Sequence, residues 1–265
     1  MHFAVCRLLP AVIALALAVT LAPAPVQAVQ HPTTAEARML SLINGARQEM
    51  GRVALRWDAR LADIAQARSD DMALTGVFAH PPSGVIADML AANGIVWYRW
   101  GEAIHRNTYD DLTVSTDVAF RGWRNSAPHW SLLTDTDFNY IAIGVARSAD
   151  GWYYWTALLL KGPDRTPPVG KMDGAKLGSI SDGKRSVTVS WSGYDIQLSV
   201  LTAGLRDFKL QRKVGSGLWK TVGDWTTATS RSLTLYVGKT YRFRVRARDN
   251  KGNLSWWSAA LTVKP

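Results

Sequence analysis

Cysteine is almost absent from this sequence, because Cys6 is the only one among 265 residues. It lies within residues 1–28, a segment typical of a secretory signal peptide, so the mature chain expected from Val29 onward holds no thiol. This composition excludes a disulfide, a thiolate metal site and a cysteine nucleophile. Outside a cell, the fold must therefore be stabilised by packing alone.

A second long apolar run is missing as well. Leu8–Leu21 follows Arg7, is interrupted only by Pro10 and Thr20, and precedes small residues that end at Ala28. It is too short for a comfortable membrane span, and no later segment is apolar enough to stop transfer. We therefore expect an exported protein without an integral membrane span; a retained N-terminal anchor is the alternative.

Acidic residues are scarce in the second half of the chain. Residues 163–265 contain 18 Lys and Arg against 7 Asp and Glu, a net charge of +11, whereas residues 29–162 contain 12 against 14, a net charge of −2. A basic module outside the cell predicts contact with anionic envelope polymers, phospholipid headgroups or extracellular nucleic acid. Solubility alone would also account for this charge.

Helical periodicity dominates the first half. Thr34 is the expected N-cap of the first helix, Leu74 and Val114 are expected on inward faces, and Gly101-Glu102 ends an extended stretch that starts at Ile95. The predicted helices cover residues 34–50, 58–75, 84–93 and 111–125, and a predicted β-hairpin covers 138–147 and 152–160. Helices followed by a hairpin predict a layered α/β domain.

The apolar period changes to two after the Pro-rich linker at residues 163–168. Short alternating segments between Gly-rich turns predict an all-β sandwich over residues 169–265. Four arginines of one strand fall on the same face, namely Arg242, Arg244, Arg246 and Arg248. This row predicts a surface for phosphate or carboxylate polymers; a solvated face with acidic partners on neighbouring strands is the alternative.

His80, Glu102 and His129 are the candidate residues for chemistry in the first half. Two imidazoles and a carboxylate can hold Zn²⁺ or a similar ion and leave a position for water. The spacing matches no compact zinc motif and by itself favours hydrogen-bonded structural histidines. His105 would share a face with Glu102 in a helix, but we expect it to be exposed and without a role.

Eight short motifs occur in order between Thr34 and Leu160. They are Met39–Asn44 with Arg47 and Gly51; Leu55–Asp58; Leu61 with Ile64-Ala65; Arg68-Ser69 with Asp71-Met72; Phe78–His80; Gly101–Ile104; Gly122–Ser126 with His129; and Ile143–Val145. Together they resemble the CAP superfamily (cysteine-rich secretory proteins, antigen 5 and pathogenesis-related 1), in particular its bacterial branch without cysteine. The resemblance covers close to half of the chain.

The resemblance implies a central cavity lined by two histidines and two acidic residues. His80, Glu102 and His129 match three of these positions, and the fourth falls at Ser126, as in many bacterial relatives. Asn125 is expected to line the same cavity. With one carboxylate fewer, the resemblance implies that Zn²⁺ or another divalent cation is bound weakly and partly through water.

The second half resembles a fibronectin type III module. Trp191 lies in an early predicted strand, Tyr241 stands at the corner position, and Trp257-Ser258 match the final strand. The predicted fold is thus a CAP-like α-β-α sandwich over residues 29–162, followed by an all-β fibronectin type III-like sandwich over residues 169–265.

Two functions follow from these resemblances. The first is a protein secreted to the bacterial envelope or medium that binds a lipid, glycan or envelope ligand, with the basic sandwich as a tether to an anionic polymer; nucleic acid is not expected as a partner. The alternative is a metal-dependent hydrolase in which Ser126 orients substrate or water. A version with Ser126 as nucleophile lacks the usual Gly-x-Ser-x-Gly turn. Whether the protein is an enzyme stays open at this point.

Overall fold

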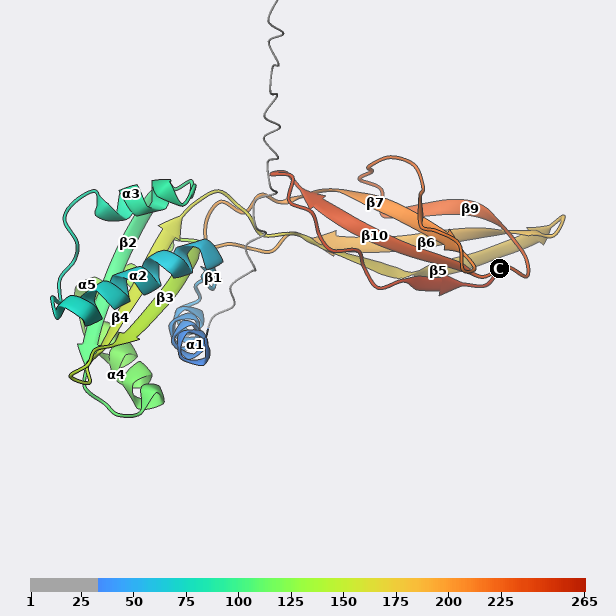
Figure 1. Cartoon of the computed structure of the whole chain (residues 1–265). Helices are drawn as coiled ribbons and strands as arrows, with labels where there is room; N and C mark the ends of the chain where they lie inside the picture. Colours follow the sequence, from blue (N-terminus) through green and yellow to red (C-terminus); the bar gives the residue numbers. More distant parts are fainter. Residues whose placement is uncertain (1–32) are drawn as a thin grey trace, which may run out of the picture.

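The computed structural model describes residues 33–265, so the predicted signal peptide and Cys6 lie outside the described residues. A helix-rich part and an elongated all-β part are joined end to end (Figure 1). The predicted linker, residues 163–168, lies between the last strand of the first part, β4 (Tyr153–Lys161), and the first strand of the second, β5 (Val169–Ser181).

A four-stranded sheet forms the middle layer of the first part. Its strands are β1 (Arg56–Trp57), β2 (Arg99–Asn107), β3 (Tyr140–Arg147) and β4, in the spatial order β1-β3-β4-β2. Only the β1–β3 pair is parallel. The central strand β4 is buried along both faces, which is why its sequence reads as a continuous apolar run and requires helices on both sides.

Helices cover both faces of this sheet. They are α1 (Thr34–Glu49), α2 (Ala59–Thr75), α3 (Val85–Ala92), α4 (Leu112–Arg124) and α5 (Ala127–Thr134). Ile64 of α2 and Ile86 of α3 pack with Leu158 on one face, whereas α1, α4 and α5 pack around Trp155 on the other. The predicted α-β-α sandwich is therefore confirmed.

Several local expectations for the first part are wrong. Thr33, not Thr34, is the N-cap of α1 and forms a capping box with Glu36. Leu74 is 87% exposed and Val114 is 44% exposed, so neither lies in the core. The pair Gly101-Glu102 lies inside β2 rather than at its end. The short helix α5 was not predicted.

The second part consists of two facing sheets. After β5 come β6 (Lys184–Tyr194), β7 (Leu205–Val214), β8 (Lys220–Thr221), β9 (Ser230–Tyr236), β10 (Tyr241–Asp249) and β11 (Leu261–Val263). The sheet orders are β11-β10-β7-β8 and β5-β6-β9, with Trp191 and Phe243 in the shared core. The all-β prediction holds, although β5 was missed; the fibronectin type III identification stays a prediction.

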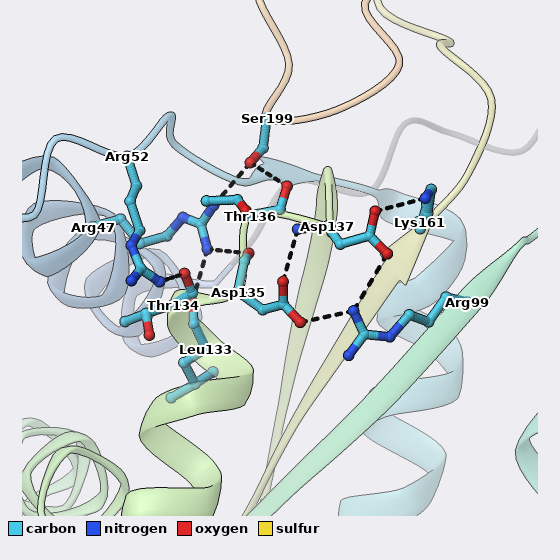
Figure 2. Close-up of polar contacts among 10 residues, drawn as sticks. All are labelled: Arg47, Arg52, Arg99, Leu133, Thr134, Asp135, Thr136, Asp137, Lys161 and Ser199. Atoms are coloured by element: carbon cyan, nitrogen blue, oxygen red, sulfur yellow. Dashed lines mark hydrogen bonds and ion pairs between the residues drawn. The ribbon is translucent and has the colours of Figure 1, made fainter.

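The loop between β6 and β7 docks on the first part. Leu198 is 3% exposed and packs in the core beneath α2 and α3. Ser199 accepts a hydrogen bond from the buried Arg47 at 3.1 Å and donates to the carbonyl of Thr136 at 2.8 Å (Figure 2). Arg47 also donates to the carbonyls of Leu133 and Asp135 at 3.0 and 2.9 Å, and burial lowers its pKa to about 10. The two parts therefore share a buried polar contact.

Three carboxylates meet beside this docking loop. Oxygen atoms of Asp164, Asp195 and Asp249 lie within 4.8 Å of one another, and two of the three residues are buried. Backbone amides satisfy them: Ala203 donates to Asp164 and Gly204 donates to Asp195. Burial, together with the charges of Asp164 and Asp249, raises the pKa of Asp195. Within residues 33–265, no Lys or Arg forms an ion pair with any of the three.

Replacing Arg47 by Ala is expected to lower the free energy of unfolding by at least about 3 kcal/mol, because it leaves a cavity and several buried carbonyl groups without a donor. The matched control is Arg38→Ala, which removes an arginine from an exposed ion pair with Asp117 and should barely shift the urea midpoint. Equal midpoints for the two variants would contradict the role given to Arg47.

Wild-type protein is expected to gain stability relative to Asp195→Asn as the pH falls from about 8 toward about 4. The sign follows from the raised pKa of Asp195: the folded state binds this proton more tightly than the unfolded state, so ionisation at higher pH destabilises the fold. Urea unfolding of both proteins across this range measures the difference. Parallel pH profiles of the two proteins would contradict the raised pKa of Asp195.

Candidate functional site

Glu102 is the fixed point of the candidate site. It lies on the edge strand β2, its side chain is 2% exposed, and its Oε1 accepts a hydrogen bond from Nε of Arg68 at 3.0 Å. Its Oε2 lies 2.7 Å from Nδ1 of His80. Arg68, on α2, also donates to the carbonyl of Ala79 at 3.0 Å, which positions the loop that carries His80. One buried carboxylate thus holds a helix, a strand and a loop together.

His80 and His129 are both bound through Nδ1. The side chain of His80 is 56% exposed and meets Glu102, whereas Nδ1 of His129, on α5, lies 2.8 Å from Oγ of Ser126. Ser126 is the N-cap residue of α5, yet its side chain makes no capping bond because it is directed to His129. Within the described residues, neither Nε2 atom has a hydrogen-bond partner.

His129 is electrostatically coupled to its neighbours. Burial, and in second place the charge of His80, lower the pKa of His129. Its imidazole is therefore neutral at pH 7 and available as an acceptor or a metal ligand.

His105 is not the exposed bystander that the sequence suggested. It is half-buried on β2, and a Cβ atom at Gly122 of α4 would collide with its ring. Its Nε2 is buried without a hydrogen-bond partner, and burial, followed by the charge of His129, lowers its pKa. As β2 is a strand, His105 and Glu102 lie on opposite faces. Strand alternation, had β2 been placed correctly, would have shown this.

The carboxylate of Glu102 is already occupied, so the ring nitrogens left for a ligand at this site are those of the two imidazoles. Both oxygens of Glu102 are already used by Arg68 and His80, so Glu102 orients a histidine, an arrangement that is common around metal-binding imidazoles. Within residues 33–265, the only three His, Asp or Glu ligand atoms within 4.8 Å of one another belong to the carboxylate cluster at the docking loop, not to this site.

A pocket of about 360 Å³ adjoins His80. Arg68, Asp71 and His80 provide its polar side, and apolar residues provide the rest. The apolar and small residues are Ala67, Val77, Ala79, Pro81, Pro82, Val85 and Met89. A larger hollow of about 760 Å³ lies along α1, but it contains no histidine or acidic residue. The smaller pocket is therefore the one that belongs to the candidate site.

The remaining predicted site residues are surface groups. Asn125 is exposed at the C-terminal end of α4. Along β10, buried residues alternate with Arg242, Arg244, Arg246 and Arg248, so the four arginines share the outer face of the sandwich. Arg248 pairs with Asp207 through two hydrogen bonds of 2.9 and 2.6 Å. One of the four thus has the acidic cross-strand partner considered as the alternative.

Two curated proteins from Bacillus subtilis (strain 168) resemble part of this chain. The uncharacterized membrane protein YlbC is 30% identical over 131 residues, which are 49% of this chain and 35% of the relative. The uncharacterized protein YkwD is 29% identical over 119 residues, 44% of each chain. The chain thus spans less than half the length of these relatives.

Solved structures of two bacterial proteins are similar to half of this chain. An extracellular protein containing a SCP domain from Bacillus anthracis is 24% identical, with a TM-score of 0.41 over 50% of this chain and 45% of the other. A cysteine-rich secretory protein from Staphylococcus aureus is 19% identical, with a TM-score of 0.38 over 50% and 41%.

The family assignment covers the segment that carries the candidate site. No helix within residues 33–265 has the length and apolar character needed to cross a membrane. Residues 40–159 match the family model described as CAP, the cysteine-rich secretory protein family, and this range contains His80, Glu102, Ser126 and His129. The first part of the chain is therefore a CAP domain of the cysteine-rich secretory protein family.

Proposed function

We propose that this is an exported binding protein whose CAP domain holds a divalent cation and a small amphipathic ligand, and whose basic sandwich tethers it to an anionic envelope polymer. One observation carries the cation site: Nδ1 of each histidine is held by a partner, which leaves both Nε2 atoms without one. Imidazoles fixed in this way are typical metal ligands. A bound cation would supply a positive centre able to attract an anionic head group.

The pocket beside His80 supports an amphipathic ligand. At about 360 Å³ it lies within the usual range for small-molecule sites. Arg68 and His80 stand at its polar side, whereas Val77, Val85 and Met89 offer an apolar lining. A lipid with an anionic head group and a short buried length of chain matches this division better than a glycan, which would need polar partners throughout.

A metal-dependent hydrolase remains the alternative, but the contacts favour it less. Glu102 is buried and neutralised by Arg68, so it is poorly placed to take a proton from a water molecule. Ser126 contacts Nδ1 of His129, and no carboxylate contacts this histidine within the described residues. A serine nucleophile normally relies on a histidine that is oriented by an acid on its other nitrogen.

Zn²⁺ at about 100 times its Kd is expected to stabilise the protein by about 2.7 kcal/mol, seen as a rise in Tm. His80→Ala and His129→Ala should each abolish the rise, whereas Glu102→Gln should weaken affinity by about 10- to 100-fold. The Arg38→Ala variant is the control and should respond like the wild type. A rise that survives loss of both histidines would reject the cation site.

Filling the pocket is expected to block the ligand without affecting the cation. Met89→Trp should reduce binding of a fluorescent fatty acid by at least about tenfold, because the larger ring occupies the apolar lining, while the Zn²⁺-dependent rise in Tm stays unchanged. The control is Leu40→Trp, which alters the larger hollow along α1. Fatty-acid binding that is unchanged in Met89→Trp would reject this pocket as the lipid site.

A further inference from the structure

The outer face of the β7–β10 pair is unusually rich in uncompensated positive charge. Facing pairs along the two strands are Arg242 with Lys213, Arg244 with Gln211, Arg246 with Lys209, and Arg248 with Asp207. Two of these four pairs are like-charged, and only one contains an acid. Like charges directly opposite on neighbouring strands destabilise a sheet. A face that served only folding or solubility would be expected to place carboxylates at these positions.

Tryptophans, rather than carboxylates, separate these cations. Trp219 and Trp257 lie on Arg244, with ring centres 4.2 and 4.6 Å from the guanidinium carbon, and Trp225 lies 4.1 Å from that of Arg248. Lys209 also lies over a ring, 5.4 Å from Trp225. An aromatic ring attracts a cation without cancelling its charge. The closely spaced row is thus stabilised while its positive potential is kept.

Three of the four arginines are held by hydrogen bonds, whereas the fourth, Arg242, and the lysine that faces it, Lys213, are not. Arg244 donates through Nε and Nη2 to Gln211, and Arg246 donates to the carbonyl of Ser255. Burial and the nearby Arg246 lower the pKa of Arg244, a sign of repulsion along the row. The side chains of Arg242 and Lys213 form no hydrogen bond, ion pair or ring contact within the described residues.

We propose that this face, from Arg248 to Arg242 and across to Lys213, binds a linear, flexible polymer of phosphodiester-linked polyols. The inference rests on the tether in the proposed function and names its partner. The row is about 20 Å long, at about 3.4 Å per residue. Guanidinium groups that are already fixed lose little freedom on binding phosphate. Within residues 33–265, the Nη1 group of Arg244, Arg246 and Arg248 has no hydrogen-bond partner.

The shape of the face favours a single flexible chain over a bilayer or duplex DNA. Trp219, Trp225 and Trp257 are half-buried against the guanidinium groups, so these three rings are not available for insertion into a bilayer. Their chain neighbours Leu218 and Trp256 are 83% and 90% exposed, and the vesicle arm of the test below addresses them. A flat sheet face also offers no helix or ribbon to enter a DNA groove. A flexible polyanion can follow the charges along the strand by adjusting its own backbone.

The test compares the full chain with the double variant Arg242→Gln/Lys213→Gln, binding to a poly(glycerol phosphate) chain at several salt concentrations. The variant should bind roughly tenfold or more weakly, and the slope of log K against log salt should fall by about 1.4 for two lost contacts. Because neither side chain has a partner, the fold should not change. The control, Lys176→Gln/Lys251→Gln, removes the same charge from other exposed positions and should lose less than about twofold.

Each other outcome overturns the proposal. The polymer site is wrong if the polymer does not bind, if the control loses as much affinity as the double variant, or if phosphatidylglycerol vesicles or duplex DNA bind more tightly than the polymer. The Zn²⁺-dependent rise in Tm separates the two sites. If the wild-type protein shows this rise but does not bind the polymer, the tether alone is rejected. If it binds the polymer but shows no rise, the cation site alone is rejected.

Discussion

The buried ion pair between Arg68 and Glu102 is the interaction on which the candidate site depends. It joins α2 to the edge strand β2, and both partners are also bound to the loop that carries His80. Removing one member of such a pair leaves a buried charge without compensation, which typically costs 3–5 kcal/mol. The arrangement of the site is therefore set by the same contact that holds the layers together, and the loop needs no disulfide to keep its position.

The guanidinium groups of this protein have three different kinds of surroundings. Arg68 is neutralised by a carboxylate, Arg47 is surrounded by carbonyl and hydroxyl oxygens, and Arg244 lies between two tryptophan rings. Only the first removes charge from the region. The second keeps a cation at the contact between the two parts of the chain, and the third keeps cations on an outer surface. The distribution of acids, rather than of bases, thus decides where the molecule remains positive.

Much of the architecture could be predicted because apolar period and motif order are properties of the sequence. The α-β-α layers, the hairpin of β3 and β4 and the outward row of arginines follow from them. What failed depends on tertiary contacts. Leu74 fits a helical apolar face but is 87% exposed. The strand β5 was missed because its glycines and polar residues give little apolar alternation along the sequence. His105 was misjudged because its neighbour across space, Gly122, is far away along the chain.

The proposed site residues show the same division. That these residues belong to one domain follows from the order of the motifs, but their hydrogen-bond partners do not. Only the structure shows that Glu102 accepts from Arg68. Only the structure shows that Ser126 contacts His129 and does not cap α5. The sequence gives the types of these side chains, but it does not say which groups they form hydrogen bonds with.

The seating of Leu198 and Ser199 on the first part has a consequence for how the molecule would act at a surface. Two domains joined by a flexible linker adopt many relative orientations, so the second domain must find its target by diffusion after the first has bound. Here a core contact and a shared arginine restrain that freedom. A molecule bound to a surface along β10 would therefore hold its CAP domain at a fixed distance from that surface and in a fixed orientation. The pocket beside His80 would then face the same direction in every bound copy.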